Sequence, residues 1–405
     1  MSLPPRSPLL QTPCTVDDVC TKCASDLSFL RSKLRPAQGA GAPALRVADI
    51  FSGCGGMSLG LQEAARRLSS RVEIALALDS DPHVVEIYQR NIGGNAQVGD
   101  VVALFDGQLG EPLTQTERKL RAAIGSVQVL LGGPPCQGHS DLNNHTRRND
   151  PKNALYLSMV RAAEVLQPAV VVVENVSAVQ WDKSQVVQLA KEAFGRLGYS
   201  VGAQVLDLWK MGVPQRRRRF VLIASQIPAL SPSAVFDSIV ADWGDHPART
   251  VRWAIEDLLQ VESKCTFDTP SKKSKANAAR MAFLFESGRY NLPNDQRPDC
   301  HRDGNHSYVS VYGRLRWDRP AQTITTGFGS MGQGRYVHPQ RRRTITPHEA
   351  ARLQAFPDWF DFGENTSRGV LSKAIGNAVP PFLMSRLGAR IVEALISTEI
   401  HKAAG

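Results

Sequence analysis

The sequence predicts an α/β fold, in which a doubly wound, mainly parallel sheet carries helices on both faces. Three observations indicate this class: a glycine-rich turn between a strand and a helix near residue 50, a second strand that ends in an acidic residue near 79, and a continuous β-branched run over 170–173. With 405 residues, 42% of them hydrophobic, the chain can bury a large core and is expected to form two lobes.

The first expected strand, over 47–50, breaks into the glycine-rich turn 51–56. A helix should follow, because apolar residues repeat at helical spacing: Leu61, Ala64, Ala65 and Leu68. Glycines at such a turn let a ligand lie against bare backbone at the helix N-terminus. The next strand, 74–78, ends in Asp79, which suits a carboxylate that accepts hydrogen bonds from a ribose diol. The spacing differs from the G-x-G-x-x-G fingerprint, so this unit alone indicates only an adenosine-containing cofactor.

One cysteine is displayed at the end of the strand expected over 127–131, in the stretch Gly132-Gly133-Pro134-Pro135-Cys136-Gln137-Gly138. Each proline fixes its own φ and restricts the residue before it, which holds the sulfur in a defined position. The flanking glycines leave room for another molecule. A thiol placed in this way is a candidate nucleophile. Taken alone, the stretch leaves open a buried apolar cysteine in a tight turn.

Charged residues follow two further strands. The run 170–173 predicts a buried parallel strand, and Glu174 comes directly after it, where α/β sheets bind their ligands. Four arginines, 216–219, lead into a strand expected over 220–224. Alternate residues of a strand face opposite sides, so Arg217 and Arg219 share one face. These residues alone leave open a solvated basic surface.

In this order, the segments resemble the DNA (cytosine-5) methyltransferase family in its bacterial form. The resemblance covers about residues 46–395 and rests on six ordered blocks: Asp49-Ile50-Phe51-Ser52-Gly53-Cys54-Gly55-Gly56, Gly133-Pro134-Pro135-Cys136-Gln137-Gly138, Glu174-Asn175-Val176, Gln215-Arg216-Arg217-Arg218-Arg219, 341–354, and Gly376-Asn377-Ala378-Val379-Pro380-Pro381. Six blocks in one order are not expected by chance, so the resemblance outweighs the separate alternatives for each segment.

The resemblance implies a smaller target recognition domain inserted into the α/β domain, with DNA in the cleft between the lobes. The chain is then expected to divide into an N-terminal extension (1–44, partly disordered), a catalytic and cofactor-binding large domain (45–227), a recognition domain with its hinge (228–371) and a C-terminal return (372–405). Within the extension, 21–34 is expected to form a short amphipathic helix.

The implied reaction is methylation of carbon 5 of cytosine. The Cys136 thiolate would add to carbon 6 and make carbon 5 enamine-like, while Glu174 would donate or share a proton near N3. Arg217 would orient the base through its carbonyl oxygen or the thiol region, and Arg219 would hold a partner carboxylate or phosphate. The methyl donor would be S-adenosyl-L-methionine. The residues expected to bind it are Phe51, Ser52, Gly53, Cys54, Gly55, Gly56, Asp79, Asp100, Val101, Pro135, Leu155, Asn377 and Val379.

Because this chemistry cannot occur inside a stacked duplex, the resemblance also implies base flipping out of double-stranded DNA. The expected DNA-binding residues are Gln137, Ser140, Arg314, Arg316, Thr323 and Thr325. His139 stands where the family usually has an aromatic residue, which puts the packing of the loop after Cys136 in doubt. The net charge of +10 is typical of a phosphate-backbone partner.

Other features of the sequence indicate where the protein works and whether it binds a membrane, a partner or a metal. There is no 18-residue apolar run and no signal-peptide pattern, and seven cysteines suit a reducing bacterial cytoplasm, so no membrane association is expected. We expect a monomer, which either shares its site with a restriction endonuclease or acts alone. Cys14, Cys20 and Cys23 suggest zinc but lack a local fourth ligand, and Cys300, His301 and His306 lack a second pair, so no metal is expected.

Three alternatives remain. An RNA cytosine methyltransferase of the same fold should carry a Cys-Phe-Thr tripeptide in its recognition region, whereas this chain has Cys265-Thr266-Phe267. A catalytically inactive DNA-binding regulator would be distinguished by a methyl-incorporation assay. A nucleotide-dependent oxidoreductase would need a fingerprint and a second chemical site that the sequence does not show. The sequence does not specify the DNA target or the role of residues 1–44.

Overall fold

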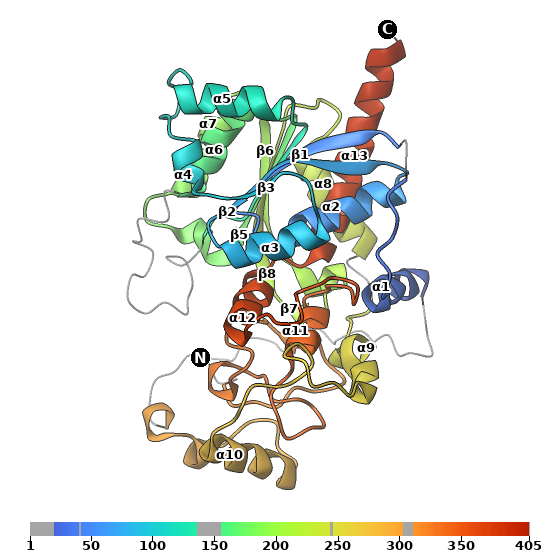
Figure 1. The fold of residues 1–405 in the computed structure, drawn as a ribbon, viewed down its shortest axis with the longest axis vertical. Coiled ribbons are helices and arrows are strands. Elements are labelled where there is room, and N and C mark those ends of the chain that lie inside the picture. The colour runs from blue at the N-terminus through green and yellow to red at the C-terminus, as the bar shows by residue number, and fades with distance from the viewer. Residues whose placement is uncertain (1–19, 40–41, 136–154, 244–245, 303–310, 405) are drawn as a thin grey trace, which may run out of the picture.

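A seven-stranded sheet with helices on both faces forms the larger lobe of the protein (Figure 1). The computed structural model describes residues 20–39, 42–135, 155–243, 246–302 and 311–404. Across the sheet, the strands are β3 (Ala96–Val98), β2 (Arg71–Asp79), β1 (Ala44–Ile50), β4 (Val129–Gly132), β5 (Val170–Val176), β8 (Arg218–Ser225) and β6 (Ser200–Asp207). Only β8 runs antiparallel to its neighbours, β5 and β6. The predicted doubly wound, mainly parallel α/β class is therefore confirmed.

Each face of the sheet is buried under its own set of helices. One face carries α2 (Gly56–Arg67), α3 (Pro82–Asn91), α8 (Pro232–Trp243) and α13 (Pro381–Ala404), and the other carries α4 (Val101–Leu104), α5 (Gln115–Ile124), α6 (Ser158–Leu166) and α7 (Val186–Arg196). Successive residues of β5 alternate between the two cores, with Val170 and Val172 in one and Val171 and Val173 in the other. A strand segment buried on both faces in this way must be apolar, as residues 170–173 are.

Local signals explain where several helices begin. α5 and α11 (Pro347–Leu353) both start with a capping box, in which a threonine accepts from the backbone of a glutamate three residues later and that glutamate accepts in return. The two pairs are Thr114 with Glu117 and Thr346 with Glu349. α3 begins at Pro82 behind Asp81, whose carboxylate accepts from the backbone N–H of His83.

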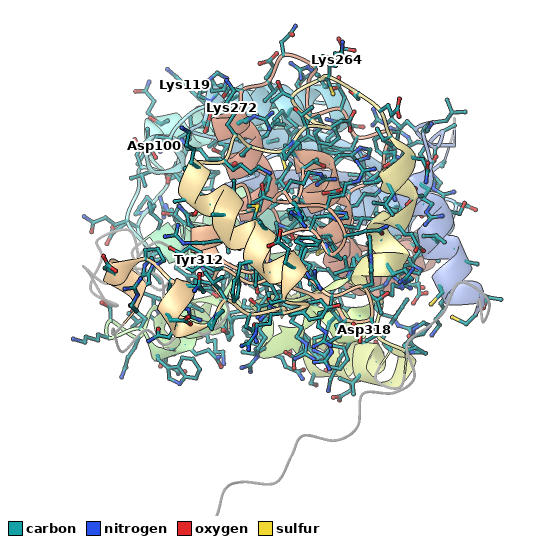
Figure 2. All side chains as sticks on the ribbon, turned by 90° about the horizontal axis from the view of Figure 1, so that it is seen from below. Asp100, Lys119, Lys264, Lys272, Tyr312 and Asp318 are labelled. Carbon is teal, nitrogen blue, oxygen red and sulfur yellow. The ribbon has the colours of Figure 1, made fainter. Side chains whose placement is uncertain are left out.

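The second lobe lies below the sheet and is mostly irregular (Figure 1). It contains α9 (Val251–Ile255), α10 (Lys275–Glu286), α11, α12 (Arg368–Asn377) and a small sheet of β7 (Gln215–Arg216) and β9 (Ala321–Gln322). A separate apolar core holds part of this lobe together: Met281, Leu284, Leu292, Tyr312, Met331 and Val337. Seen from below, Lys264 and Lys272 lie toward one edge of the view and Asp318 toward the other (Figure 2).

Single-turn 3-10 helices complete the described chain. They span Ser177–Trp181, Leu208–Met211, Glu256–Gln260, Asn294–Gln296, Asp299–His301 and Met331–Gln333. Before β1, α1 (Thr21–Arg31) forms within the predicted range 21–34, and it buries Phe29 and Leu30. The structure places α8, which the expected boundary at 228 assigns to the recognition domain, against β6 and α13 of the large lobe.

No helix in the described ranges has the length and apolar character that a membrane span requires.

Candidate active site

The strand that leads to the candidate nucleophile is closely packed at its end. β4 finishes at Gly132, where a Cβ atom would lie 2.3 Å from Sδ of Met159 and 3.0 Å from the carbonyl oxygen of Ile50, so only glycine fits. Pro134 follows, and its carbonyl oxygen accepts a hydrogen bond of 3.3 Å from Nδ2 of Asn175. Cys136 itself lies outside the described residues. The structure therefore defines the approach to the thiol, at the carboxyl end of β4.

Glu174 lies at the same edge of the sheet, on the neighbouring strand. The parallel register pairs Gly132 with Val173, so the next residues of the two strands, Gly133 and Glu174, are adjacent. A Cβ atom on Gly133 would lie 3.8 Å from Oε2 of Glu174. Glu174 is 7% exposed. Its carboxylate is thus buried beside the segment that enters the expected nucleophile loop.

Arg219 is the partner of this carboxylate. It stands near the start of β8, which pairs antiparallel with β5 and brings it opposite Val176. Nε of Arg219 lies 2.7 Å from Oε1 of Glu174, and the two side chains are 13% and 9% exposed. The short distance makes this a charge-assisted contact in a poorly hydrated place, where such contacts are strongest. Glu174 is thus a partner carboxylate of the kind that the sequence suggested for Arg219.

Arg217 is placed differently from the sequence-based expectation. It is 2% exposed, and its guanidinium donates to the carbonyl oxygens of Ile324 at 2.9 Å and Ala378 at 3.0 Å. These bonds tie the arginine segment to the connection after β9 and to the end of α12. These contacts give Arg217 a part in holding the segments together, and its expected role toward the base or the thiol region stays a prediction.

Two glutamines complete this internal framework, and sequence analysis gave neither of them a role. Gln215 is fully buried, donates 2.7 Å to Oε1 of Gln354, and accepts from the backbone N–H of Ile324 at 3.0 Å. Gln354 in turn donates to the carbonyl oxygen of Ile375 at 2.5 Å. Both stand inside the quoted blocks, but their partners are more than 20 residues away, so only the fold shows what they hold together.

The candidate cofactor cradle is the turn between β1 and α2. Phe51 and Gly53 both have left-handed backbone conformations, with φ of 57° and 52°, and a Cβ atom on Gly53 would meet nothing within 4 Å. Ser52 hydrogen-bonds through its backbone N–H to Leu78 at 3.1 Å. The turn therefore curls at the strand end and leaves open space beside the Gly53 backbone, where a ligand could approach it.

The expected C-terminal contribution does reach this turn. A Cβ atom on Gly56 would lie 2.1 Å from the carbonyl oxygen of Val379, so the two segments touch. A Cβ atom on the preceding residue, Gly55, would lie 2.9 Å from Tyr88 and 2.8 Å from Ile92, so these side chains pack closely against it. Asn377 is exposed. The N-terminal and C-terminal segments of the predicted cofactor site are thus in contact at Gly56 and Val379.

Asp79 faces the same turn. Its Oδ2 accepts from the backbone N–H of Gly53 at 2.9 Å and its Oδ1 from that of Asp81 at 3.0 Å. Burial raises the pKa of Asp79, although these hydrogen bonds act in the opposite direction. The backbone of Ser80 also donates to this carboxylate, and a carboxylate has about four acceptor sites, so Asp79 retains capacity for a ribose hydroxyl. Asp100 caps α4 by accepting from the backbone of Val102 and is exposed.

The remaining predicted cofactor residues line the same region or lie nearby in the chain. Val101 is buried, while Pro135 and Leu155 are partly buried at the two ends of the undescribed segment. Cys54 is buried, and desolvation raises its pKa to about 12. A thiol with such a pKa is inert, so the second motif cysteine does not compete with Cys136 as a nucleophile.

A buried carboxyl group lies directly under the turn. Asp49 is 1% exposed and accepts from Oγ of Ser58 at 2.6 Å, and Ser58 also lies 2.8 Å from the hydroxyl of Tyr88. Burial raises the pKa of Asp49 to about 7, while the Ser58 hydrogen bond acts in the opposite direction. This chain of polar groups links β1, α2 and α3 behind the candidate cofactor cradle.

The predicted DNA-binding residues fall into two groups. Gln137 and Ser140 lie outside the described residues. Thr323 donates 2.7 Å to the carbonyl oxygen of Arg216, and the hydroxyl of Thr325 lies 2.8 Å from that of Tyr336. These two hydroxyls therefore help to hold the β7–β9 junction, next to the bonds that Arg217 makes.

Arg314 and Arg316 share one aromatic ring. Their guanidinium carbons both lie 4.3 Å from the ring centroid of Tyr290, and that of Arg314 is also 4.5 Å from the ring of Phe285. Arg314 is only 8% exposed, whereas the side chain of Arg316 is 40% exposed and lies 3.6 Å from Asp318. Burial between two rings weighs against a base contact by Arg314, while Arg316 remains accessible.

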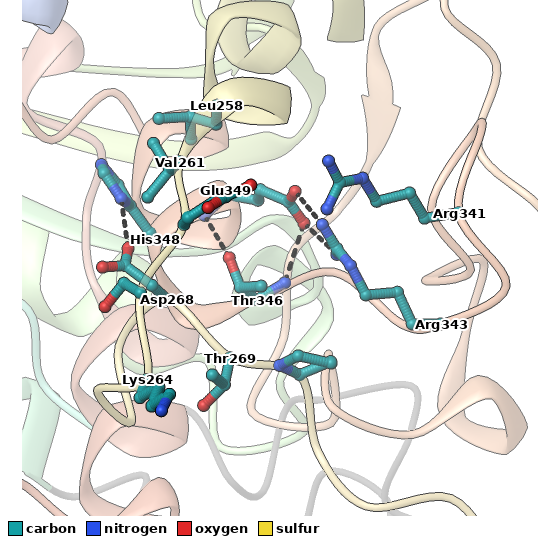
Figure 3. A pocket seen from close by; sticks show the side chains of 13 residues that line it. Leu258, Val261, Lys264, Asp268, Thr269, Arg341, Arg343, Thr346, His348 and Glu349 are labelled. Atoms are coloured by element: carbon teal, nitrogen blue, oxygen red, sulfur yellow. Dashed lines mark hydrogen bonds and ion pairs between the residues drawn. The ribbon is translucent and has the colours of Figure 1, made fainter.

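A pocket of about 630 Å³ lies elsewhere, and none of the predicted site residues lines it (Figure 3). Its wall includes His348, which bonds Asp268 at 2.8 Å, and Glu349, which Arg343 holds at 2.7 Å. Desolvation lowers the pKa of His348, but the hydrogen bonds that its ring donates to the carboxylates of Asp268 and Asp358 outweigh it, and the net pKa is raised. The first pair joins α11 to Asp268 and the second joins it to Arg343, so both support the second lobe.

Comparison with known proteins places the chain in a family. The sequence model of the C-5 cytosine-specific DNA methylases matches residues 45–393. The chain is 44% identical to the type II methyltransferase M1.BsuMI of Bacillus subtilis (strain 168), over 88% of this chain and 82% of that protein. It is 30% identical to the type II methyltransferase M1.HphI of Haemophilus parahaemolyticus, over 85% of this chain and 86% of that one.

Two solved structures show the same fold. One is a prophage-encoded DNA modification methyltransferase of E. coli, with a TM-score of 0.59 and 21% identity over 87% of this chain and 99% of that one. The other is the Dnmt2 methyltransferase of S. pombe, with a TM-score of 0.59 and 18% identity over 88% of this chain and 99% of that one.

Proposed function

This chain belongs to the C-5 cytosine-specific DNA methylases and is a DNA cytosine-5 methyltransferase, and from that premise we propose how its residues carry out the reaction. The observation that carries the proposal is the buried Glu174–Arg219 pair at the end of β5, beside the segment that leads to Cys136. Cys136 attacks carbon 6 of a cytosine flipped out of duplex DNA. Glu174 then holds a proton at the ring nitrogen N3, which relieves the negative charge on the ring.

Arg219 keeps Glu174 in place through its Nε and carries positive charge beside the ring. Arg217 acts one step further away, because its bonds to Ile324 and Ala378 hold the strand start on which Arg219 stands. After methyl transfer, loss of the proton from carbon 5 expels the Cys136 sulfur and restores the ring. Positive charge from this arginine segment also favours the thiolate form of Cys136.

The methyl donor in the proposal is S-adenosyl-L-methionine, which supplies an electrophilic methyl group when bound. The residues present fit it: Gly53 has open space beside its backbone, and Asp79 accepts from the Gly53 backbone N–H through one carboxylate oxygen. Asp79 would hold the ribose hydroxyls, and Phe51 would lie beside the adenosine. Val379, whose carbonyl oxygen closes on Gly56, would complete the pocket.

Replacing Asp79 with alanine should weaken binding of S-adenosyl-L-methionine by about 1–3 kcal/mol, the cost of losing charge-assisted hydrogen bonds. Calorimetry on the purified protein measures this directly. Asp81→Ala is the matched control, because Asp81 caps α3 and its loss should lower stability while leaving cofactor affinity unchanged. Unchanged cofactor affinity in a folded Asp79→Ala protein would remove Asp79 from the site.

For recognition, we propose that the second lobe, within the expected range 228–371, reads the DNA sequence while the large domain performs the chemistry. Arg316→Ala should then relax discrimination at one base pair by about 1–3 kcal/mol. Arg314→Ala should instead lower the free energy of unfolding, because Arg314 is buried between Phe285 and Tyr290. Methylation rates on a panel of single-base variants of the target measure the first effect, and denaturant unfolding measures the second. Equal weakening on every sequence would make Arg316 a phosphate contact.

The setting proposed is a monomer in a bacterial cytoplasm. Several relatives are named as type II methyltransferases, and we propose a restriction endonuclease of the same specificity as a partner.

Long-read or bisulfite sequencing of DNA from cells that express the chain tests the function. A single sequence motif with 5-methylcytosine is the expected result. Unmethylated cellular DNA, together with no methyl transfer by the folded, purified protein in an assay supplied with S-adenosyl-L-methionine, would contradict it.

A further inference from the structure

A group of metal-binding side chains lies far from the candidate active site, at the start of α1. Cys20 is the N-cap of this helix, Cys23 lies in its first turn, and His246 comes from the segment that follows α8. The two sulfur atoms and a ring nitrogen all lie within 4.8 Å of one another. We propose that Cys20, Cys23 and His246 bind a structural Zn²⁺ that fastens α1 to the body of the protein.

The distances suit a zinc ion. With Zn–S near 2.3 Å and Zn–N near 2.0 Å, a tetrahedral site has ligand atoms roughly 3.5–3.8 Å apart. Sγ of Cys20 lies 3.1 Å from Nε2 of His246, and the whole group stays within 4.8 Å. Adjustments of up to about 1 Å in these separations would therefore place one ion between all three. Two cysteines separated by two residues are also the spacing that zinc sites use most often.

The histidine is oriented as a metal ligand would be. Its Nδ1 lies 3.4 Å from the carbonyl oxygen of Pro247, which can accept only if Nδ1 carries the proton. That tautomer leaves Nε2, the nitrogen that faces Cys20, with a free lone pair for an ion. The ring also packs against Trp243, at 5.2 Å between centroids, which limits its rotation.

The helix end favours a thiolate at Cys20. Its sulfur accepts from the backbone N–H of Cys23 at 3.2 Å, at the positive end of α1. Zinc binds thiolate rather than thiol, so this environment lowers the cost of binding.

A buried ion-pair network, separate from the three proposed ligands, holds α1 against the segment after α8. Asp26, one turn after Cys23, forms ion pairs of 2.5 Å with Arg249 and with Arg386, and all three side chains are almost fully buried. The Arg249 guanidinium also donates to the carbonyl oxygen of Gly212 at 2.8 Å. Because this network fixes α1 relative to the segment after α8, Cys23 and His246 face each other before any ion binds.

The position of α1 gives the site a structural role. At its other end, the carbonyl oxygens of Leu30 and Ser32 accept from the backbones of Asp358 and Trp359, at 3.0 and 2.9 Å, in the second lobe. The helix thus contacts both lobes, and a metal at its start would fix it to the larger one. Cys14, which the sequence pairs with these cysteines, lies outside the described residues, so the structure assigns three ligands.

Metal analysis of the full-length protein, purified with reductant from zinc-supplemented cells, tests the proposal. We expect about one Zn²⁺ per chain, and Co²⁺ in its place should give the thiolate-to-metal charge-transfer absorption of a tetrahedral site. Cys20→Ser, Cys23→Ser and His246→Ala should each weaken Zn²⁺ affinity by at least about 100-fold, since losing even outer-shell partners costs about 10–100-fold. His246→Cys, which restores a ligand, should keep the ion.

Matched controls are Cys265→Ser and His83→Ala, which remove a free cysteine and an exposed histidine elsewhere and should leave Zn²⁺ binding unchanged. If the ligand variants fail to fold, chelation of the wild-type protein supplies a second measurement. Removing Zn²⁺ should speed hydrogen exchange in the amides of α1 (Thr21–Arg31) and leave β5 protected. A metal-free wild-type protein, a Cys20–Cys23 disulfide under reducing conditions, or undiminished Zn²⁺ affinity in Cys23→Ser and His246→Ala would overturn the proposal.

Discussion

Cys136→Ser should abolish methyl transfer while leaving binding of cofactor and DNA largely intact. A serine hydroxyl at neutral pH is a far weaker nucleophile than a thiolate, and losing a covalent nucleophile costs about 10⁴-fold or more in kcat. Incorporation of labelled methyl groups into duplex DNA measures the rate. The wild-type protein should also form a denaturant-resistant complex with DNA that carries 5-fluorocytosine, because the fluorine cannot leave as a proton does.

Cys265→Ser controls for the loss of a thiol, since the hydrogen bonds described for the Cys265 sulfur are to Ser263 and Asp268 in the second lobe. It should methylate at the wild-type rate. Normal turnover by Cys136→Ser, or the absence of any adduct on DNA containing the recognised site, would show that the reaction does not pass through this cysteine.

Separating Glu174 from Arg219 should have the second largest effect. Glu174→Gln removes the proton carrier and should lower kcat by about 10²–10⁴-fold. Arg219→Ala leaves a buried carboxylate without its 2.7 Å partner, which costs about 3–5 kcal/mol and misplaces Glu174. If the two act as one unit, the double variant should be little slower than the slower single variant. Single-turnover rates of all four proteins complete the cycle.

Glu117 and Arg161 form the matched control pair. They are buried at 0% and 3% exposure, lie 2.6 Å apart, and join α5 to α6 away from the carboxyl ends of the strands. Breaking this pair should lower the free energy of unfolding while the folded fraction keeps the wild-type kcat. Additive effects in the Glu174–Arg219 cycle would mean that the two residues contribute separately to the reaction.

Much of the catalytic framework could be predicted from the chain alone, because its signals are local. Apolar β-branched runs predict buried strands, and the strand ends of a parallel sheet meet at one edge. Glu174 and the segment before Cys136 were therefore expected at that edge, and the register of β4 with β5 confirms that they are neighbours. The same holds for the turn at Gly53, whose φ of 52° matches the need for glycine.

The contacts between distant segments could not be read in this way. Sequence analysis expected a carboxylate or phosphate partner for Arg219 but did not identify it, and the structure shows Glu174 there. It did not foresee that Arg217 bonds the backbone of Ile324 and Ala378. Arg314 was expected to bind DNA, but two aromatic rings that precede it by more than 20 residues cover it. Side-chain direction and burial depend on the path of the whole chain, which no short pattern encodes.

The cysteine pair near the N-terminus also shows which properties the sequence determines and which need the tertiary structure. The sequence by itself determined the α/β class, the family and the residue types available at each strand end, because spacing and composition act over a few residues. Only the tertiary structure decided which of those side chains meet. His246 lies 226 residues from Cys20, and it comes within 3.1 Å because α8 packs on the sheet while Asp26 binds Arg249 and Arg386. Long-range proximity arises from burial and packing of the whole core, and therefore appears only when the chain is folded.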